Sequence, residues 1–567
     1  MFYCGVLGAG LRIAAPFLLA ASVVSLGRLP TARAALPALG LFTGPLGPAL
    51  LALGAALSVV GIASQRRVRQ PSEVVLFSLS FVLAAGLGLR HVARLGPTGD
   101  EIRYLIVAQS LWRDGDVDLR NNLERGDYRE YVPDLRRGLG IRGHRGNPLV
   151  PLHRPGLPAL VAPAYALAGR AGCVLLLAGL LSSLGLGVRR LARRATGDEH
   201  AALVAWAAAT GPPALYFAAF LYPEVPAALA VTLVLAGANP RSRVAGAIGI
   251  ALAASCLPWL HVRLIPGTAA LGFVALLRLR GLARWAFVAT AGGMAVAYLG
   301  YGKLVHGAWV PTRAYRGTLG NVPLEQALGG LLLDPSFGLL AYAPVFLLSL
   351  AAAPALLRRT DHWRLVLPVL VMALGIPVVT FGHWYGGFSP PARLLVSAVP
   401  VLALLVAMRV AEHGPSRRGL GRWATPLLLG GLGLAVFAFA SPERKLHVQG
   451  RESVSRAWAA LAGDVSVARY LPRLAKPADP AAVRPEAAPD ERRVAIVWCL
   501  ALGTLLALDR LAVRRDRVDR LFRSLALPLG LFLVLSLAVD HWARRNPAVP
   551  PILAPDAEED EAAQAGG

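Results

Sequence analysis

Charged residues are scarce in this sequence. They make up 16% of its 567 residues, whereas a soluble globular protein carries about 25%. Apolar residues make up 55%, and the mean hydropathy is +0.54. Apolar runs long enough to span a bilayer recur along the whole chain. The composition therefore excludes an ordinary soluble enzyme. It predicts an all-α, polytopic integral membrane protein, because irregular backbone cannot face lipid.

The sequence also lacks the short alternating segments of a transmembrane barrel, and it has few cysteines. Each of the four cysteines lies in or beside an apolar run, and no CxxC spacing occurs; they are Cys4, Cys173, Cys256 and Cys499. This pattern favours small packed side chains over metal ligands or disulfides. The first apolar run has no basic region before it and leads into a second run. We therefore predict a retained helix and not a cleaved signal peptide.

Acidic residues are outnumbered by basic ones, 33 against 58, which gives a net charge of +25. The arginines stand in short clusters between apolar runs, as the positive-inside rule predicts for cytoplasmic loops, so we exclude nucleic acid as the partner. The clusters are Arg66, Arg67 and Arg69; Arg189, Arg190, Arg193 and Arg194; Arg278, Arg280 and Arg284; Arg358, Arg359 and Arg364; Arg417, Arg418 and Arg422; and Arg514, Arg515, Arg517 and Arg520. If they share the cytoplasmic side, four segments lie outside, namely 95–155, 306–335, 382–393 and 441–493.

The apolar runs predict about 13–15 transmembrane helices. Their ranges are 2–26, 36–63, 72–94, 157–188, 201–220, 223–238, 244–261, 264–279, 285–305, 336–357, 365–381, 394–411, 424–440, 494–513 and 524–540. The run 157–188 is long for one span and contains Arg170, which favours a short interfacial piece followed by a helix. The predicted parts are two N-terminal helices (1–71), a membrane region with the loop 95–155 (72–440), an external polar segment (441–493), C-terminal helices (494–540) and an acidic, disordered tail (541–567).

One polar stretch, GDEIRYLIVAQSLWRDGDVDLRNN at residues 99–122, follows the third span. Its apolar residues recur at helical spacing and predict an amphipathic helix on the membrane surface; they are Ile102, Leu105, Ile106 and Trp112. Asp100 and Glu101 stand at the helix N-terminus, where the dipole favours anions. A simple N-cap would explain one of these carboxylates without any chemistry.

Asp114, Asp116 and Asp118 alternate in the same stretch, as ligands do in a calcium-binding EF-hand loop. Position six of such a loop would be Leu119 in place of Gly, and position twelve would be Arg125 in place of Glu. A calcium loop is therefore disfavoured, and Asp114-Gly115-Asp116 predicts a turn.

The stretch 99–122 resembles the first external loop of the GT-C membrane glycosyltransferases, in particular bacterial relatives of the protein O-mannosyltransferases and aminoarabinose transferases. Further stretches share the resemblance: HRPGLPALVAPAYALAG (153–169), LYPEVPAAL (221–229), LPWLHVRL (257–264), DPSFGLLAYAPVFLL (334–348) and HWYGGFSPPARLL (383–395). Together they run from about residue 72 to 411. The first two helices and the region after residue 440 carry no such motif.

The resemblance implies a lipid-linked donor, such as a polyprenyl-phosphate monosaccharide, and an external Asp that acts as the base. An acceptor hydroxyl would attack the anomeric carbon while the lipid phosphate leaves. That needs a base aimed at the acceptor and positive charge near the phosphate. Asp100 is our candidate for the base, and Glu101 would position the acceptor or tune Asp100. Tyr104, on the same predicted helix, is included as a substrate-binding candidate.

Candidate cations for the phosphate stand near predicted outer helix ends. Arg393 begins a span after SPPA, and Arg263 lies in LPWLHVRL; a planar guanidinium donates two parallel hydrogen bonds to phosphate. Snorkelling of the side chain to the membrane interface would explain the position of either arginine equally well. Weaker candidates are His153, Arg154 and Lys303, which is one of only three lysines.

Other polar residues have two interpretations each. Glu224 after Pro223 would bind sugar hydroxyls or be an ordinary N-terminal helix charge, and both stay open. Trp384 would stack on a sugar or belong to the interfacial aromatic belt. No HxxxH or related spacing supports a metal site at the histidines 153, 261 and 383. The resemblance nevertheless leaves room for a divalent ion held by Asp100 and Asp116.

The resemblance implies an integral membrane glycosyltransferase of GT-C type in a bacterial inner (plasma) membrane, with its site facing the periplasm or exterior. Its partners would be the lipid-linked donor, the bilayer and a glycan, lipid or protein acceptor. The rival class is a transporter or lipid-carrier flippase, in which membrane charges line a path.

Overall fold

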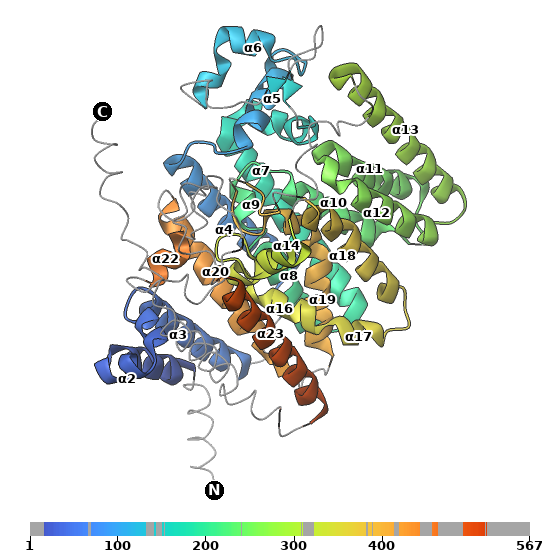
Figure 1. Ribbon diagram of the computed structural model, residues 1–567. Helices are drawn as coiled ribbons and strands as arrows, with labels where there is room; N and C mark the ends of the chain where they lie inside the picture. Colours follow the sequence, from blue (N-terminus) through green and yellow to red (C-terminus); the bar gives the residue numbers. More distant parts are fainter. Residues whose placement is uncertain are drawn as a thin grey trace, which may run out of the picture. The chain divides into compact units, whose positions relative to one another are not determined.

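The computed structural model describes fifteen stretches of the chain: 16–65, 70–131, 141–142, 150–151, 153–239, 241–307, 309, 322–381, 384–387, 389–412, 419–442, 456–462, 474, 491–515 and 518. These residues are helical almost throughout (Figure 1). The described residues include one short exception, the antiparallel pair β1 (Ile141–Arg142) and β2 (Val150–Pro151). The predicted all-α class is confirmed.

The chain divides into two compact units. The first unit contains Met1–Arg69, Leu333–Ser336 and Arg451–Gly567, and the second contains Gln70–Leu332 and Phe337–Gly450. In the first unit the described elements are the helix Pro16–Arg28, α2 (Pro30–Ala35), the 3-10 helix η1 (Pro37–Phe42), α3 (Leu46–Gln65), α22 (Arg456–Ala462) and α23 (Glu491–Arg514). A small apolar cluster around Val23, Leu36 and Leu39 packs its N-terminal helices together.

The second unit carries the remaining helices. They are α4 (Glu73–Arg94), α5 (Glu101–Arg113), α6 (Arg120–Arg125), η2 (Asp127–Glu130), α7 (Gly156–Thr196), α8 (Glu199–Thr210), α9 (Tyr216–Ala219), α10 (Glu224–Gly237), α11 (Val244–Leu260), η4 (Val262–Leu264), α12 (Ile265–Arg278), α13 (Gly281–His306), α14 (Leu324–Leu333), α15 (Leu339–Tyr342), η6 (Pro344–Phe346), α16 (Leu347–Ala351), α17 (Ala353–Leu357), α18 (Trp363–Val379), η7 (Arg393–Ala398), α19 (Val399–Ala411), η9 (Gly419–Trp423) and α20 (Ala424–Ala440).

Six helices in the described part of the chain are long and apolar enough to cross a membrane. They are Glu73–Arg94, Gly156–Thr196, Gly281–Val305, Arg393–Ala411, Gly421–Ala440 and Val494–Arg514. Seven shorter apolar helices accompany them, among them α10, α11 and α18. Many of the predicted spans are therefore helices of 10–17 residues. The predicted span 524–540, the acidic tail, Cys4 and the arginines at 66–69 and 417–418 lie outside the described residues.

A backbone break interrupts α7. Ala168 (φ −150°, ψ 27°) and Gly169 (φ 55°, ψ −141°) are not helical, so a short piece from Gly156 is followed by a long helix that begins at Arg170. Glycine meets this φ without a Cβ clash. The sequence prediction of a short piece before the span is confirmed.

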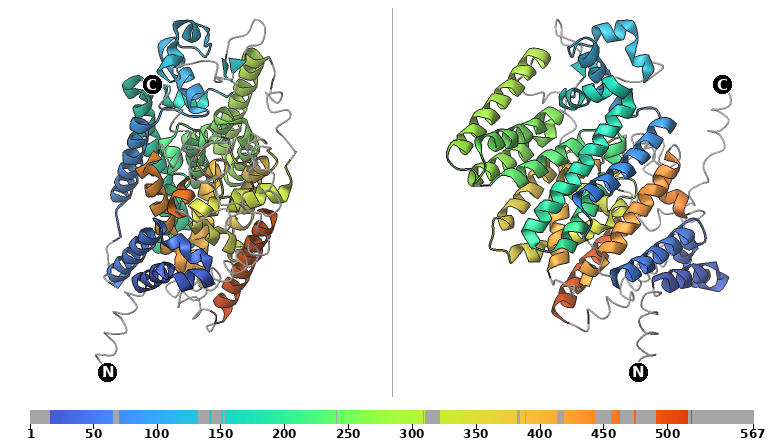
Figure 2. Two further views of the ribbon diagram at one scale, coloured as in Figure 1. Left: turned by 60° about the vertical axis from the view of Figure 1, so that its left-hand side comes forward. Right: turned by 180° about the vertical axis from the view of Figure 1, so that it is seen from behind.

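Helices of the second unit pack in layers around α7 and α10. The helix α4 lies along α7, and α11, α12 and α13 lie side by side (Figures 1 and 2). Most side chains of α10 are buried, whereas α13 exposes most of its length. This exposure fits contact with lipid acyl chains.

The arginine clusters gather at one end of these helices. Arg190 near the end of α7 pairs with Glu73 at the start of α4. Arg359 donates to the carbonyl oxygen of Ala195 over 2.9 Å. Arg278 at the end of α12 lies 2.7 Å from His362. Among the described residues of the second unit, arginines of three of the six predicted clusters therefore lie at one end of its helices. That this end faces the cytoplasm stays a prediction.

Candidate functional site

Side chains from five separate segments meet at the other end of the second unit's helices. Asp100 stands at the N-terminus of α5, and His153 precedes α7. Glu224 is the first residue of α10, Arg263 lies in η4 after α11, and Arg393 is the first residue of η7. We call this group the Asp100–Arg393 cluster. The sequence predictions included all five residues, although they are up to 293 positions apart.

Two arginines and a histidine surround the carboxylate of Asp100. Its Oδ2 accepts a hydrogen bond from Arg393 Nη2 at 2.9 Å. Its Oδ1 accepts from Arg103 Nη1 at 2.8 Å and lies 3.1 Å from His153 Nε2. An ionised carboxylate offers about four acceptor positions. Among the described residues Oδ1 has two close partners and Oδ2 has one, so Oδ2 offers a further acceptor position.

Asp100 is also accessible, and it does not act as a capping side chain. Its side chain is 19% exposed. It occupies the N-cap position of α5, yet its side chain makes no capping hydrogen bond. The simple N-cap interpretation of the sequence is therefore wrong, because the carboxylate is turned toward the two arginines and the histidine instead.

The charges around Asp100 keep it ionised. Burial on its own would raise the pKa of Asp100, but the positive charges of His153, Arg393 and Arg103 outweigh burial and hold that pKa well below its ordinary value. The carboxylate is therefore deprotonated across the physiological range.

Glu224 and the two predicted phosphate arginines form a buried ion-pair network. Oε1 of Glu224 accepts from Arg393 Nε at 3.0 Å and from Arg263 Nη2 at 3.1 Å. The remaining nitrogens of Arg393 donate to Asp100 and to the carbonyl oxygen of Gly386. Arg393 also lies over the ring of Tyr222, 4.1 Å from its centroid. All three nitrogens of Arg393 therefore have protein partners.

The segment before Arg393 is strained. Ala392 adopts a left-handed conformation, φ 55° and ψ 26°, which residues with a Cβ rarely adopt. Its backbone N–H donates to the carbonyl oxygen of Phe337 at 2.9 Å. Such strain persists only where surrounding contacts fix the chain, and here it sets the direction of Arg393.

Glu101 has a different environment from Asp100. It is fully buried, and its Oε1 accepts the backbone N–H of Leu221 at 2.9 Å while Oε2 accepts that of Thr98 at 2.9 Å. Arg170 Nη2 lies 3.4 Å from Oε1. These contacts tie the start of α5 to the segment before α10, so Glu101 is placed to position Asp100.

Arg154, the residue after His153, is buried without a hydrogen-bonding partner. It is 2% exposed, and none of its three guanidinium nitrogens has a partner among the described residues. Its guanidinium carbon lies 4.5 Å from the ring centroid of Tyr298 and 5.2 Å from that of Tyr301. These tyrosines share one face of α13, because they are three residues apart.

The surroundings of Arg154 contain further unused donors. The ring of Trp259 lies 5.5 Å from each tyrosine ring. Its indole nitrogen and the hydroxyl of Tyr298 are buried and have no partner in the described part of the chain. Cation–π contacts return about 2 kcal/mol when buried, less than an unpaired buried charge costs. A cation with two spare donors is complementary to an anion.

Aromatic rings connect His153 to its neighbours. Its ring lies 5.2 Å from that of Tyr104 and 5.9 Å from that of His261. Tyr104 is 1% exposed, so it packs under the site. The Nδ1 of His261 accepts the backbone N–H of Arg263 at 3.2 Å. His383 lies outside the described residues.

The structure overturns the suggested ion site at Asp100 and Asp116. These residues stand at opposite ends of α5, a 13-residue helix that is about 20 Å long. Asp116 instead accepts from Ser110 Oγ at 3.1 Å. In the described part of the chain no group of three or more His, Cys, Asp or Glu residues could hold a metal ion.

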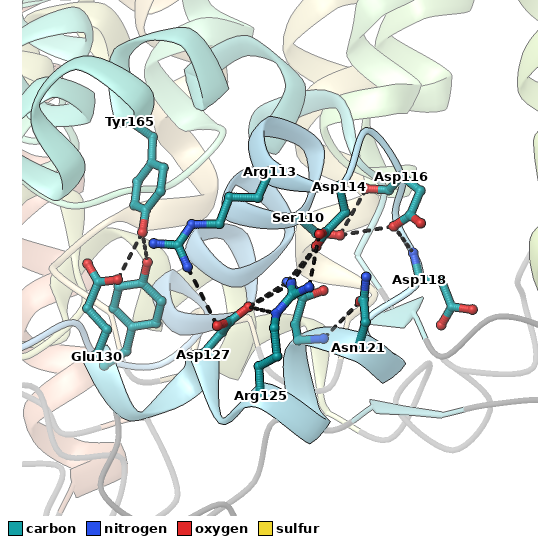
Figure 3. Close-up of polar contacts among 12 residues, drawn as sticks. Ser110, Arg113, Asp114, Asp116, Asp118, Asn121, Arg125, Asp127, Glu130 and Tyr165 are labelled. Atoms are coloured by element: carbon teal, nitrogen blue, oxygen red, sulfur yellow. Dashed lines mark hydrogen bonds and ion pairs between the residues drawn. The ribbon is translucent and has the colours of Figure 1, made fainter.

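The remaining carboxylates of the stretch form a self-contained network (Figure 3). Arg125 donates to Asp114 at 2.7 Å and to Asp127 at 3.0 Å. Asn122 donates to both carboxylates. Gly115 has φ 75°, so the predicted turn at Asp114-Gly115-Asp116 is confirmed. This network folds α6 and η2 onto α5.

The helix α5 is not the surface helix that its spacing predicts. Leu105 and Ile106 are fully buried within the protein, and only Trp112 of the four apolar residues is strongly exposed, at 59%. Ile106 packs with Val107 and Leu119 under the loop. The expectation was wrong because the loop after α5 folds back and covers its apolar face.

Two predicted ligand-binding residues lie elsewhere. Trp384 is 2% exposed, and its ring packs directly on Gly330, which leaves it no free face for a sugar. Lys303 lies 6.0 Å from the ring centroid of Trp309, near the end of α13. Neither residue contacts the Asp100–Arg393 cluster in the part of the chain that the structure describes.

The sequence analysis did not identify several residues that contact the predicted site residues. Arg103 follows Asp100 by three residues, a helical spacing that predicts an ion pair. Tyr298 and Tyr301 show the same spacing, which marks a shared face. Tyr222 and Arg170 gave no such signal, because their contacts join distant parts of the chain.

Comparisons with known proteins show a similarity to solved structures. The sequence matches no protein-family profile and no curated protein. Two crystal structures of ArnT from Cupriavidus metallidurans are similar to this chain, one bound to undecaprenyl phosphate and one in the apo state. Each alignment covers 82% of this chain and 77% of the other, with a TM-score of 0.39. The identities are 13% and 15% respectively.

Proposed function

We propose that this protein is a membrane glycosyltransferase of GT-C type. It moves a monosaccharide from a polyprenyl-phosphate donor to an acceptor hydroxyl on the outer face, with inversion at the anomeric carbon. The acceptor oxygen forms the new bond to that carbon, its proton goes to Asp100, and the bond to the phosphate oxygen breaks. The phosphate leaves with the electron pair, so it needs positive charge beside it.

The observation that carries this proposal is the adjacency of a base and an anion-complementary group. His153 contacts Asp100, and the next residue, Arg154, is a buried guanidinium without a partner in the described part of the chain. One short segment before α7 therefore carries both the histidine beside the base and the guanidinium offered to the phosphate. Arg154 is therefore our candidate for the phosphate, in place of Arg393 and Arg263.

The division of roles follows from the contacts. Arg393 and Arg263 neutralise Glu224 and orient Asp100, and Glu101 fixes the start of α5. Oε2 of Glu224 is buried and has no partner among the described residues, so it is free to accept a donor-sugar hydroxyl. The exposed flank of α13 lets a lipid donor approach Arg154 from the bilayer.

The placement of charge favours this function over transport. Glu224, Arg263 and Arg393 all stand at the ends of helices. A transporter or flippase would place its binding residues near the bilayer midplane, on broken helices.

The first test replaces the base. Asp100→Asn keeps the shape of the side chain, so the variant should fold and bind donor, yet lose about 10²–10⁴-fold in rate because it cannot take the proton. Asp114→Asn, in the surface network, is the matched control and should lose little. Sugar transfer by purified variants in detergent is the measurement. Near-normal transfer by a well-folded Asp100→Asn protein would refute the assignment.

The second test concerns the phosphate. Arg154→Met should weaken donor binding by about 10–100-fold, the effect of one to two charge-assisted hydrogen bonds. The same change should raise the melting temperature of the lipid-free protein, because it removes a buried unpaired charge. Arg243→Met, at the exposed N-terminus of α11, is the control. A lowered melting temperature with unchanged donor affinity would make Arg154 a structural residue.

A further inference from the structure

A second charged cavity lies at the C-terminal end of α4. It has a volume of about 360 Å³ and is lined by the segment 92–97, by Glu130 and Tyr131 at the end of η2, and by Arg170 of α7. We call it the α4 pocket. Its lining residues do not include any member of the Asp100–Arg393 cluster, although Arg170 also contacts Glu101 at the start of α5.

Two guanidinium groups line the α4 pocket with unused hydrogen-bonding capacity. Arg94 is exposed and has no ion pair or hydrogen bond in the described part of the chain. Arg170 is 10% exposed, and its Nη1 donates to the carbonyl oxygen of Leu95 at 2.5 Å. Its Nε is buried and has no partner among the described residues. The break in α7 at Gly169 brings Arg170 to this position.

Two carboxylates lie beside these cations. The fully buried Glu101 pairs with Arg170 at 3.4 Å, and Glu130 lines the pocket itself. Oε2 of Glu130 accepts a hydrogen bond from the hydroxyl of Tyr165 at 3.1 Å, and that hydroxyl also bonds the hydroxyl of Tyr131 (Figure 3). Glu130 is therefore held by tyrosines and forms no ion pair with Arg94 or Arg170 in the described structure. Arg170 is paired with Glu101, so Arg94 supplies the positive charge that no carboxylate neutralises among the described residues.

We propose that the α4 pocket binds a phosphate group at Arg94 and Arg170, either that of an anionic lipid or free phosphate. Planar guanidinium groups match the oxygens of a phosphate and donate parallel hydrogen bonds to them. The volume is within the range of small-ligand sites. The pocket also stands at the end of a membrane-length helix, the level at which lipid headgroups lie.

The effect of Glu130 on binding distinguishes an anionic ligand from other ligands. A carboxylate beside a bound anion weakens binding, so Glu130→Gln should tighten it while keeping a partner for Tyr165. If the pocket held a neutral sugar or a cation instead, loss of the carboxylate would weaken binding.

The experiment measures phosphate binding by the full-length protein in neutral detergent. All variants carry Arg154→Met, which removes the other anion-complementary group and makes the result independent of the proposed transfer reaction. Equilibrium dialysis with labelled inorganic phosphate forms one arm. Native mass spectrometry from nanodiscs of phosphatidylcholine, with and without phosphatidylglycerol, forms the other.

We expect Arg94→Gln to weaken binding by about 5–20-fold, Glu130→Gln to tighten it, and the exposed Arg120→Gln on the same loop to change nothing. Arg94 makes no contact that its loss would break, so its variant should fold. Binding in the first arm identifies free phosphate as the ligand, and binding only in the second identifies a lipid headgroup. Unchanged binding in Arg94→Gln, weaker binding in Glu130→Gln, or no binding in either arm would overturn the proposal.

Discussion

The contacts of Asp100 have opposite effects on its orientation and on its affinity for a proton. Contacts with Arg393, Arg103 and His153 keep it ionised and oriented, but they also lower its affinity for a proton. A general base works best when its pKa is near the working pH. In the proposed reaction these contacts favour orientation of Asp100 over its basicity, and departure of the phosphate would drive proton uptake.

This arrangement predicts a pH profile. The pKa of Asp100 lies well below its ordinary value, so Asp100 should cause no acid limb in kcat/KM between about pH 5 and 8. The stability that its ionised form contributes is present above about pH 4 and is lost as the pH falls through the folded pKa.

Arg103→Gln should change the acid side of the pH profile of kcat/KM. Arg103 is 28% exposed, so its loss should be tolerated by the fold. Removing the positive charge of Arg103 raises the pKa of Asp100, so the acid limb of kcat/KM should move to higher pH. The profile is measured on purified enzyme with a saturating acceptor. An unchanged limb would show that Asp100 does not control the rate.

Residue types at helix ends could be predicted from sequence, whereas their pairings could not. Asp100, Glu224, Arg263 and Arg393 stood out because charge is rare in this chain. The contacts of each arginine depend on distances between elements that are far apart in the sequence. These distances decide which arginine pairs with Glu224 and which is left for the proposed substrate. Arg154 was rated a weak candidate for that reason, since only the structure shows that its nitrogens have no partner among the described residues.

Among the elements, α7 and α5 show what periodicity can and cannot predict. The length of the run 157–188 and the presence of Arg170 predicted the break in α7. Burial of α5 could not be predicted, because an apolar stripe looks the same whether lipid or the chain's own loop covers it. The cluster of Ile106, Val107 and Leu119 settles this in favour of the loop.

The break in α7 predicts opposite effects for two glycine substitutions in one helix. Gly169 has a φ of 55°, so Gly169→Ala should destabilise the protein by about 1–3 kcal/mol through backbone strain alone. Gly179→Ala, in the regular part of α7, should stabilise it by about 0.5–1 kcal/mol. No atom lies within 4 Å of a Cβ added at either site. Thermal unfolding in detergent gives the comparison, and equal effects would refute the role of the break.

At the scale of the whole second unit, charge is sorted between the two ends of the helices. The Asp100–Arg393 cluster lies at one end, and the contacts of Arg190 and Arg359 lie at the other. A site at a helix end can meet a lipid carrier and a water-soluble acceptor together. The function therefore depends on which end faces outward.

Surface labelling tests that orientation. In a background without the four native cysteines, an impermeant thiol reagent should label Glu124→Cys in intact cells, because this exposed residue lies on the loop beside the site. Arg193→Cys, 63% exposed near the end of α7, should be labelled only after permeabilisation, since basic loops stay in the cytoplasm. Asn122 is unsuitable because it is buried between Asp114 and Asp127. Labelling of Arg193→Cys but not Glu124→Cys in intact cells would place Asp100 in the cytoplasm, where an acceptor on the outer face could not reach it.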